Sequence, residues 1–339
     1  MRIKSIKKFC EFAKITEDQF HGKEIIDANL YLCPLTAIPE GFKPRVNGWL
    51  DLSDLTKIPK GFEPIVSDSI FMDRVKVFPK WFKPVADIIE ANSVQKIEEG
   101  FNPIVRRLKC EYLLSVPDNF NFKGEYLDFD LVTKVGKNFK PIVTENIYLM
   151  ELKQIPMGFA PKCYVIRLDE LHRHDEKAYY AIKQKAEVFR TKPRPIIKYK
   201  KGKKTYVLID GQLDELLSQR GNVLMLKNIV KDEKHYAVTD GNGHYAHGKT
   251  IKEARESLLY KMADRDKSAY ENIDTSKKMP FAKAIQMYRV ITGACALGVK
   301  DFVDRKKLPK KPYSPKDIAK LTKGEYGHET FCNFFKINP

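Results

Sequence analysis

The residues best suited to covalent chemistry are a cysteine and a histidine in the last quarter of the chain. Cys295 lies just after Gly293 near a predicted helix start, where a thiol becomes reactive if a base lies beside it. His328, within Gly-His-Glu-Thr, is the candidate base. No third residue that would orient the histidine can be named, and small residues around a buried thiol also suit tight helix packing. We therefore expect no catalytic residues.

A second group combines His235, His244, His247 and Asp240 around a predicted hairpin turn. A metal site would need two or three of these histidines to converge with a carboxylate. His244 and His247 are three residues apart, so on one strand they would face opposite sides of the sheet. We therefore expect exposed hairpin histidines and no metal ion.

Sequence motifs for cofactors are also missing. The chain has no G-x-x-x-x-G-K-[ST] loop, no G-x-G-x-x-G after a strand and no H-E-x-x-H. None of its six cysteines forms Cys-x-x-Cys or lies at metal-ligand spacing from a histidine. We predict no cofactor.

Two dense basic runs are the candidate polyanion-binding segments, and both are interpreted as loops. Residues 1–170 contain 25 Lys and Arg against 24 Asp and Glu, whereas residues 171–339 contain 36 against 20. The excess positive charge therefore belongs to the second half, which favours nucleic acid as a partner there. Lysines that only keep the protein soluble are the alternative. The candidate residues are Lys198, Lys200, Lys201, Lys203, Lys204, Arg305, Lys306, Lys307, Lys310 and Lys311.

The first half of the chain is organised by an internal repeat. Segments 35–44, 55–64 and 75–84 share the pattern [LV]-x-x-[IF]-P-x-x-F-x-P, and weaker copies follow at 94–103, 113–122, 132–141 and 152–161. One such unit cannot bury its own apolar side, but stacked units can. The phenylalanines, which recur every 19 or 20 residues, should then form a continuous spine: Phe42, Phe62, Phe82, Phe101, Phe120, Phe139 and Phe159.

A short alternating strand precedes each copy, as in the pairs Leu30/Leu32 and Leu50/Leu52. Alternation places both members of a pair in the core and the residue between them on the outer face. The outer side chains mix aromatic and acidic groups, which favours a groove for a basic or aromatic-rich protein segment; a merely solvated face is the alternative. The candidate partner-binding residues are Tyr31, Asp51, Phe71, Asp73, Glu90, Glu111, Asp128, Asp130 and Tyr148.

The residue before each repeat phenylalanine is glycine or asparagine in all copies except one. These two residue types tolerate positive φ, so we predict a turn with a left-handed residue. Trp81 occupies this position in the third copy. Its turn must be remodelled or strained, and its indole is a candidate surface anchor.

The predicted fold is of the α/β class, with an N-terminally capped solenoid of leucine-rich-repeat type followed by a smaller α+β domain. Residues 1–27 form a helical cap, 28–171 seven repeats and a closing strand, 172–195 a linking helix that ends at Lys192-Pro-Arg-Pro195, and 196–339 the basic domain. Strands are expected at 196–199, 206–209, 223–230 and 235–239, and helices after the capping box at Thr250 and at 280–306, 315–322 and 326–335.

The chain contains no apolar run near the ~18 residues of a membrane span, and its N-terminus lacks the features of a signal peptide. Scattered cysteines without an export signal indicate reduced thiols. We therefore expect a cytoplasmic protein without membrane contact.

The repeat resembles the short leucine-rich repeats, about 20 residues long, of bacterial effectors and of many bacterial and phage proteins, over about residues 28–171. The regular proline after the phenylalanine departs from that pattern. Residues 235–262 resemble in shape the strand–turn–strand–helix of HicB-type antitoxins. The repeat resemblance implies a solenoid that binds partners.

We therefore expect a non-catalytic recognition protein whose solenoid face binds a protein. A role as a phage or mobile-element factor acting on a host component is compatible with this expectation. One alternative is a protein that binds nucleic acid through its basic C-terminal domain. The least favoured alternative is a cysteine-dependent enzyme.

Overall fold

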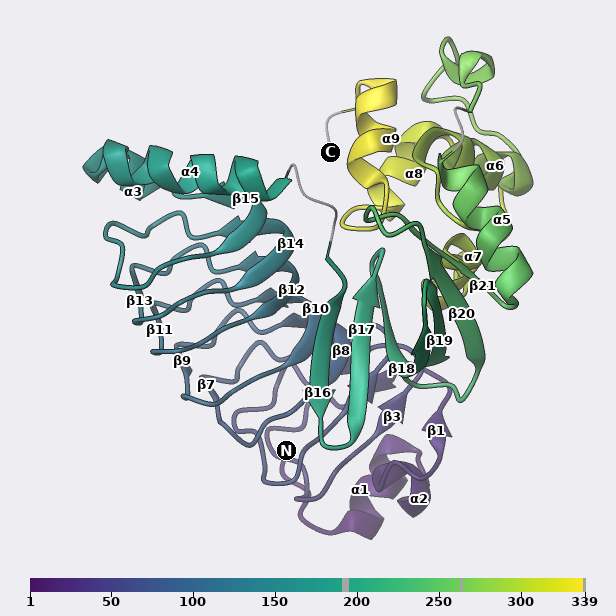
Figure 1. Cartoon of the computed structure of the whole chain (residues 1–339). Helices are drawn as coiled ribbons and strands as arrows, with labels where there is room; N and C mark the ends of the chain where they lie inside the picture. The colour runs from purple at the N-terminus through teal and green to yellow at the C-terminus, as the bar shows by residue number, and fades with distance from the viewer. Residues whose placement is uncertain (191–194, 263–264, 338–339) are drawn as a thin grey trace. The chain divides into compact units, whose positions relative to one another are not determined.

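The computed structural model describes residues 1–190, 195–262 and 265–337. Its first part is a parallel β-solenoid of about eight turns (Figure 1). One strand from each turn pairs with the strand of the next turn, in the order β1 (Ile25–Ile26), β3 (Arg45–Val46), β5 (Ile65–Val66), β8 (Val85–Glu90), β10 (Ile104–Lys109), β12 (Lys123–Asp128), β14 (Ile142–Tyr148) and β15 (Lys162–Arg167).

The early turns contain a second short strand beside this path: β2 (Leu30–Tyr31), β4 (Leu50–Asp51) and β6 (Ser69–Phe71). Strand β8 pairs with both β5 and β6, so from β8 onward a single longer strand covers both positions. Further two-stranded pairs are β7 (Val77–Phe78) with β9 (Lys96–Ile97) and β11 (Ser115–Val116) with β13 (Lys134–Val135).

The register of the parallel strands stacks equivalent side chains of successive turns. Leu30 lies opposite Leu50, and Leu50 lies opposite Ile70. Ile70 then continues the same inward column to Ile89. The structure places both members of every predicted inward pair in the buried core.

The repeat phenylalanines form the predicted spine. The rings of Phe62 and Phe82 stack with centroids 5.6 Å apart and an interplanar angle of 4°. The stack continues without a gap from Phe42 to Phe159, with successive centroids at most 6.5 Å apart. Offset ring pairs at such distances add to the stability that burial alone provides.

The predicted left-handed turn residue is present in six of the seven copies. The φ angles of Gly61 and Gly100 are +71° and +92°, and Asn119 and Asn138 both have φ of +57°. Trp81 has no positive φ. Its turn is therefore remodelled rather than forced into the left-handed region.

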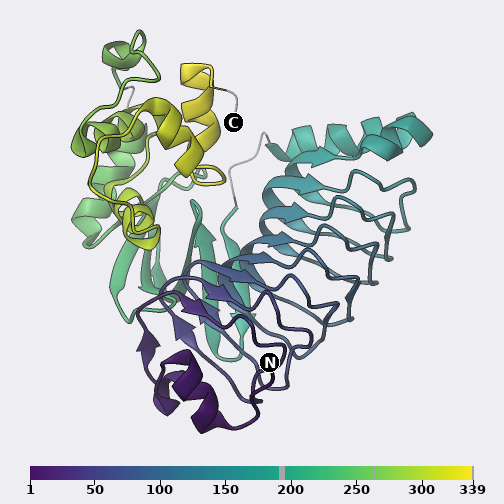
Figure 2. The ribbon, with the colours of Figure 1, turned by 180° about the vertical axis from the view of Figure 1, so that it is seen from behind.

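Helices cover both ends of the solenoid (Figure 2). At the N-terminal end, α1 (Ile6–Ala13) and α2 (Glu17–Phe20) bring Phe9 and Phe20 to within 5.0 Å and 5.1 Å of the Phe42 ring centroid. At the other end, α3 (Asp169–His174) and α4 (Glu176–Arg190) follow β15. The segment predicted as a linking helix thus closes the core, because Ile182 and Ala186 of α4 are buried in it. The predicted breaker at 192–195 lies, up to residue 194, outside the described residues.

Six antiparallel strands come next, in sequence order: β16 (Ile197–Lys201), β17 (Lys204–Ile209), β18 (Gln212–Arg220), β19 (Val223–Asn228), β20 (Lys234–Thr239) and β21 (Tyr245–Gly248). The chain forms two compact units, which divide within these strands. Residues 1–208, 213–215 and 228–232 belong to the first unit, and 209–212, 216–227 and 233–339 to the second. The predicted boundary at 195/196 therefore falls inside the first unit.

The hairpin of β16 and β17 packs onto the solenoid. Tyr199 and Tyr206 are buried in one cluster with Val85 and Ile104 of the parallel sheet. The Tyr199 hydroxyl donates to the carbonyl oxygen of Val105 at 3.2 Å or to that of Lys123 at 3.0 Å. Sequence periodicity could not reveal these contacts, because their partners lie 94 and 76 residues apart in the chain.

In the second unit, α5 (Ile251–Met262) lies against β20 and β21, with Ala254 and Leu258 facing Val238 and Ala246. The remaining elements are the short helix at Ser268–Tyr270 and the helices α6 (Phe281–Thr292), α7 (Ala296–Arg305), α8 (Pro315–Leu321) and α9 (His328–Phe335). The single helix predicted at 280–306 is broken, because Gly293 ends α6 with φ of +77° and Cys295 begins α7 as its N-cap. Strand β18 was not predicted, since its residues do not alternate. None of the helices in the described ranges is long and apolar enough to cross a membrane.

Candidate partner-binding site

The candidate partner-binding residues form two adjacent rows on the outer surface of the parallel sheet. Tyr31 lies opposite Asp51, Asp51 opposite Phe71, and Phe71 opposite Glu90. The same row continues through Lys109, Asp128 and Tyr148 to Arg167. The second row lies two residues further along each turn and includes Asp73, Glu111 and Asp130. We call these two rows the outward face.

Aromatic side chains on the outward face differ in exposure. Tyr31 is 59% exposed, and its ring meets that of Trp49 edge to face with centroids 6.0 Å apart. Phe71 and Tyr148 are half-buried, and the Tyr148 hydroxyl accepts a hydrogen bond from the Asn146 amide at 2.9 Å. The face therefore offers ring surface, and the rings of Tyr31 and Tyr148 are held by contacts with Trp49 of the next turn and with Asn146 of the same strand.

Two of the predicted acidic residues are engaged within the chain. The Asp51 carboxylate accepts hydrogen bonds from the Ser53 backbone N–H at 3.0 Å and from the Ser53 hydroxyl at 2.7 Å. Asp128 is only 4% exposed, and its Oδ2 accepts from the Arg107 guanidinium. Oδ1 of Asp128 is buried and has no hydrogen-bond partner among the residues that the structure describes. Burial raises the pKa of this carboxyl, although Arg107 opposes the shift.

The other acids of the face are not neutralised within the described part of the chain. Glu90, Glu111, Asp130 and Asp73 are partly or fully exposed and form no ion pair there. Burial and the charge of Glu111 raise the pKa of Asp130, and the nearby Lys109 only partly offsets them. The centre of the face therefore carries negative charge that Lys109 offsets only in part, which favours a cationic group as its ligand.

The sequence indicated that the first basic run is a loop. The structure shows instead that it forms the turn end of the β16–β17 hairpin. Its lysines divide into engaged and exposed ones. Lys201 donates to the carbonyl oxygen of Lys83 at 2.7 Å and lies 3.7 Å from Glu63, while Lys204 pairs with Glu215 at 3.0 Å. Lys198, Lys200 and Lys203 are exposed. Burial lowers the pKa of Lys201, Glu63 opposes this shift, and the charge of Lys83 adds to it.

The second basic run lies at the end of α7 in the second unit. Arg305 pairs with Glu325 at 2.9 Å, and Lys306 is the C-cap of the helix. The Lys311 amine lies 5.8 Å from the ring centroid of Tyr313. Lys307 and Lys310 complete the run, and Lys310 is exposed. Arg305 would therefore have to leave Glu325 before it could bind a polyanion.

The structure does not join the candidate thiol to its candidate base. The Cys295 thiol is buried and accepts from the Gly298 N–H at 3.3 Å. Burial raises its pKa, although the backbone N–H groups of His247 and Gly298 oppose the shift. His328 instead lies 3.4 Å from the Thr322 hydroxyl and 3.7 Å from the Cys332 sulfur. His328 is therefore not placed to act as the base of Cys295.

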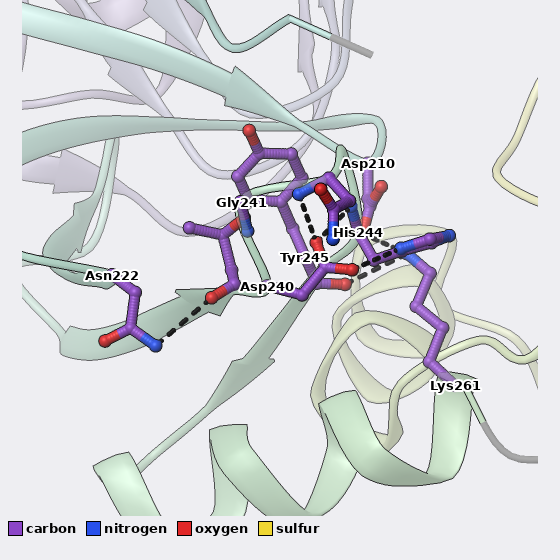
Figure 3. Close-up of polar contacts among 9 residues, drawn as sticks. Asp210, Asn222, Asp240, Gly241, His244, Tyr245 and Lys261 are labelled. Carbon is purple, nitrogen blue, oxygen red and sulfur yellow. Dashed lines mark hydrogen bonds and ion pairs between the residues drawn. The ribbon is translucent and has the colours of Figure 1, made fainter. Parts of the chain in front are cut away.

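The hairpin histidines have different environments, and the prediction that all three are exposed is wrong. His235 and His247 are buried on the neighbouring strands β20 and β21, with ring centroids 5.9 Å apart. His244 is exposed at the turn, and its Nδ1 lies 2.6 Å from Asp240 Oδ2 (Figure 3).

A buried ion pair in the second unit was not predicted from the sequence. The Lys261 amine, from the last turn of α5, donates to Asp210 at 2.6 Å and to the carbonyl oxygen of Tyr245 at 2.9 Å (Figure 3). It also lies 4.3 Å from the ring centroid of Tyr326. Burial by itself lowers the pKa of Lys261, but the charge of Asp210 and the hydrogen bonds raise it above its ordinary value. The pair joins α5 to the turn that follows β17.

A comparison with protein-family models found no match, and neither the curated proteins nor the solved structures included a significant similarity to this chain.

Proposed function

We propose that this protein is a non-catalytic recognition protein whose outward face binds an extended, basic segment of a partner protein. The observation that carries the proposal is the group of carboxylates at Glu90, Glu111 and Asp130, which form no ion pair in the described part of the chain and whose charge Lys109 offsets only in part. Lysine or arginine side chains of a partner would relieve their mutual repulsion. The leucine-rich type of the repeat and a role as a phage or mobile-element factor belong to the same proposal and rest on the resemblance of the repeat pattern.

Aromatic side chains beside these acids support a protein as the partner. Tyr31, Phe71 and Tyr148 occupy the same row of the outward face, and such rings often dominate the energetics of protein interfaces. The phenylalanine stack fixes the spacing of this row before a segment binds. Binding should therefore cost the protein little conformational entropy. Catalysis by Cys295 and His328 has no comparable support, since their side chains contact other groups.

A selection from a display library of random peptides tests the proposal. The wild-type protein should enrich peptides rich in lysine or arginine, and the double variant Glu111→Gln/Asp130→Asn should lose that enrichment. The matched control is Glu40→Gln/Glu99→Gln, which removes the same charge from two exposed turn residues off the outward face. Equal selection by all three proteins, or no enrichment of basic residues by the wild type, would refute the proposal.

A second comparison tests the aromatic residues. Tyr31→Ala should weaken binding of the selected peptides, whereas Tyr112→Ala should not, although Tyr112 is similarly exposed, at 54% against 59%. Phe71→Ala and Tyr148→Ala should weaken binding in the same way. If all three substitutions leave binding unchanged, the rings of the outward face are not part of the site.

A further inference from the structure

The turn edge of the solenoid has one irregular position, and it holds an exposed aromatic ring. Trp81 stands where the neighbouring turns have Gly61 and Gly100, and it is 39% exposed. Because both neighbours are glycines, no side chain of the same position stands beside the indole on either turn. The two glycines, Trp81, Glu63, Lys80 and Lys83 line a hollow of about 480 Å³.

The hollow is wide open to solvent, so a ligand would lie across it rather than be enclosed. Its lining suits a ligand with one flat apolar part and negative charge, since an indole and two lysines are present. Lys80 and Lys83 are exposed and form no ion pair within the described part of the chain. Of the acids nearby, Glu63 lies 3.8 Å from Lys43, and Glu98 accepts the backbone N–H of Lys80 at 3.1 Å.

A second basic segment reaches the same edge from a distant part of the sequence. The Lys201 amine donates to the carbonyl oxygen of Lys83 across 118 residues of chain and lies 3.7 Å from Glu63. This contact holds the turn of the β16–β17 hairpin beside the hollow. Lys200 and Lys203 of that hairpin are exposed and form no ion pair among the residues described. Positive charge from two separate segments therefore lies at the edge that holds the exposed indole.

We infer that this hollow, which we call the Trp81 hollow, binds single-stranded nucleic acid, with a base stacked on the indole and phosphates on Lys80, Lys83 and the hairpin lysines. Unpaired bases present their ring faces to aromatic side chains, whereas the bases of a duplex are already stacked. Lysines bind the backbone irrespective of sequence and release its counterions. An isolated phosphate or an acidic peptide would use the lysines and leave the indole without a role.

This site is independent of the outward face, which carries the opposite charge and is proposed to bind protein. Binding here would also differ from non-specific attraction of a polyanion to the net positive charge of the second half of the chain, because Trp81, Lys80 and Lys83 all belong to the solenoid. Binding should therefore depend on one ring and a few lysines and not on net charge. No sequence preference is expected, since stacking accepts every base.

The two tryptophans of the chain, Trp49 and Trp81, make a direct test available. In the Trp49→Phe variant all tryptophan fluorescence comes from Trp81. Titration with an oligothymidylate of about 12 nucleotides, within the ~4–16 nucleotides that single-strand-binding folds cover, should quench this emission. The Trp81→Phe variant, which reports only Trp49, should show no quenching.

Affinity measurements separate stacking from charge. Trp81→Ala should weaken oligothymidylate binding about 5- to 150-fold, which corresponds to ~1–3 kcal/mol per stacked base. Lys80→Gln/Lys83→Gln should reduce the slope of log K against log salt by about 1.4, because each phosphate that a lysine neutralises on a single strand contributes ~0.7 to the slope. The matched control is Lys177→Gln/Lys185→Gln, which removes the same charge from exposed positions of α4 and should leave the slope unchanged.

Three outcomes would overturn the inference. One is unchanged Trp81 emission at saturating oligothymidylate, and another is wild-type affinity of the Trp81→Ala variant. The third is equal quenching by polyglutamate of the same charge, which would show a site for any polyanion without base stacking. Because Trp81 is exposed, its substitutions should leave the far-ultraviolet circular dichroism unchanged, so a failure to bind can be assigned to the site. Peptide selection on the outward face should not change in any of these variants.

Discussion

The phenylalanine stack can be tested most directly at its central ring. Phe101 is 3% exposed, and its ring centroid lies 5.9 Å from that of Phe82, 6.4 Å from that of Phe120 and 4.8 Å from that of Phe78. Phe101→Ala removes a buried ring, which costs ~3–5 kcal/mol in protein cores. We expect the upper part of this range, since each aromatic pair adds ~0.5–1.5 kcal/mol beyond burial.

The terminal ring provides a control within the same stack. Phe159 is 8% exposed and has a single ring neighbour, Phe139, at 5.9 Å. Phe159→Ala should therefore cost less than Phe101→Ala by about two ring pairs, or ~1–3 kcal/mol. Phe101→Leu keeps most of the buried volume and should give an intermediate loss.

Denaturant unfolding followed by far-ultraviolet circular dichroism measures these differences. The chain has two compact units, so two transitions can occur, and only the one that the Phe101 variants shift reports on the solenoid. If Phe101→Ala unfolds at the wild-type denaturant concentration, or if Phe159→Ala loses as much stability as Phe101→Ala, the stack does not hold the solenoid together as argued.

Three further predictions concern stability. Lys261→Met leaves Asp210 buried without its cation and should lower the free energy of unfolding by ~3–5 kcal/mol in a denaturant titration. Burial lowers the pKa of His328 in the folded protein below the ~6.5 of an unfolded histidine, so the unfolded state binds the proton more readily. The free energy of unfolding should therefore be highest above about pH 6.5 and should decrease as the pH falls below that value. In His328→Gln this part of the stability–pH curve should be flatter. Gly158→Ala places a Cβ 2.6 Å from Asn138 Oδ1 at φ of +77°, whereas at Gly41 a Cβ meets nothing within 4 Å, so the first variant should show a clearly lower melting temperature than Gly41→Ala.

The solenoid could be predicted from the sequence because its main interactions repeat along the chain. The regular spacing of phenylalanines such as Phe62 and Phe82 places like side chains in register, and glycine or asparagine before them indicates the left-handed turn. The outward row followed from the same periodicity. The tryptophan at position 81 was recognised as an exception, and the structure shows how the turn accommodates it.

Other features depend on contacts that no local pattern encodes. In the sequence Lys201 is one of many lysines in a basic run, and its contact with Lys83, like the burial of Tyr199 against the parallel sheet, becomes visible only in the structure. Asp128 has the alternation of an outward residue, yet Arg107 reaches across from the neighbouring strand and helps to bury it. The end of α6 at Gly293 and the contact of Lys261 with Asp210 also depend on tertiary packing, so neither could be predicted from a local pattern.

Buried charged residues of the parallel sheet are brought into contact by the register of the strands, although they are about one turn apart in the sequence. Asp87 and Arg106 are 19 residues apart, and the register places them side by side on β8 and β10. The guanidinium donates to the Asp87 carboxylate at 2.6 Å and 2.9 Å and lies 3.5 Å from Glu125 on the next turn. In this solenoid, these charged side chains therefore contact residues one turn away rather than their neighbours in sequence.

The same principle explains why the net charge of the solenoid half says little about its partners. Residues 1–170 are almost neutral overall, with 25 basic against 24 acidic residues. Their position within the repeat nevertheless separates the signs, since Glu111 and Asp130 lie on the outward face while Lys80 and Lys83 lie on the turn edge beside Trp81. Because each turn fixes these positions relative to the next, a nearly neutral solenoid can present two surfaces of opposite charge. The proposed protein segment and the proposed nucleic-acid strand would then bind to different surfaces and would not compete for one site.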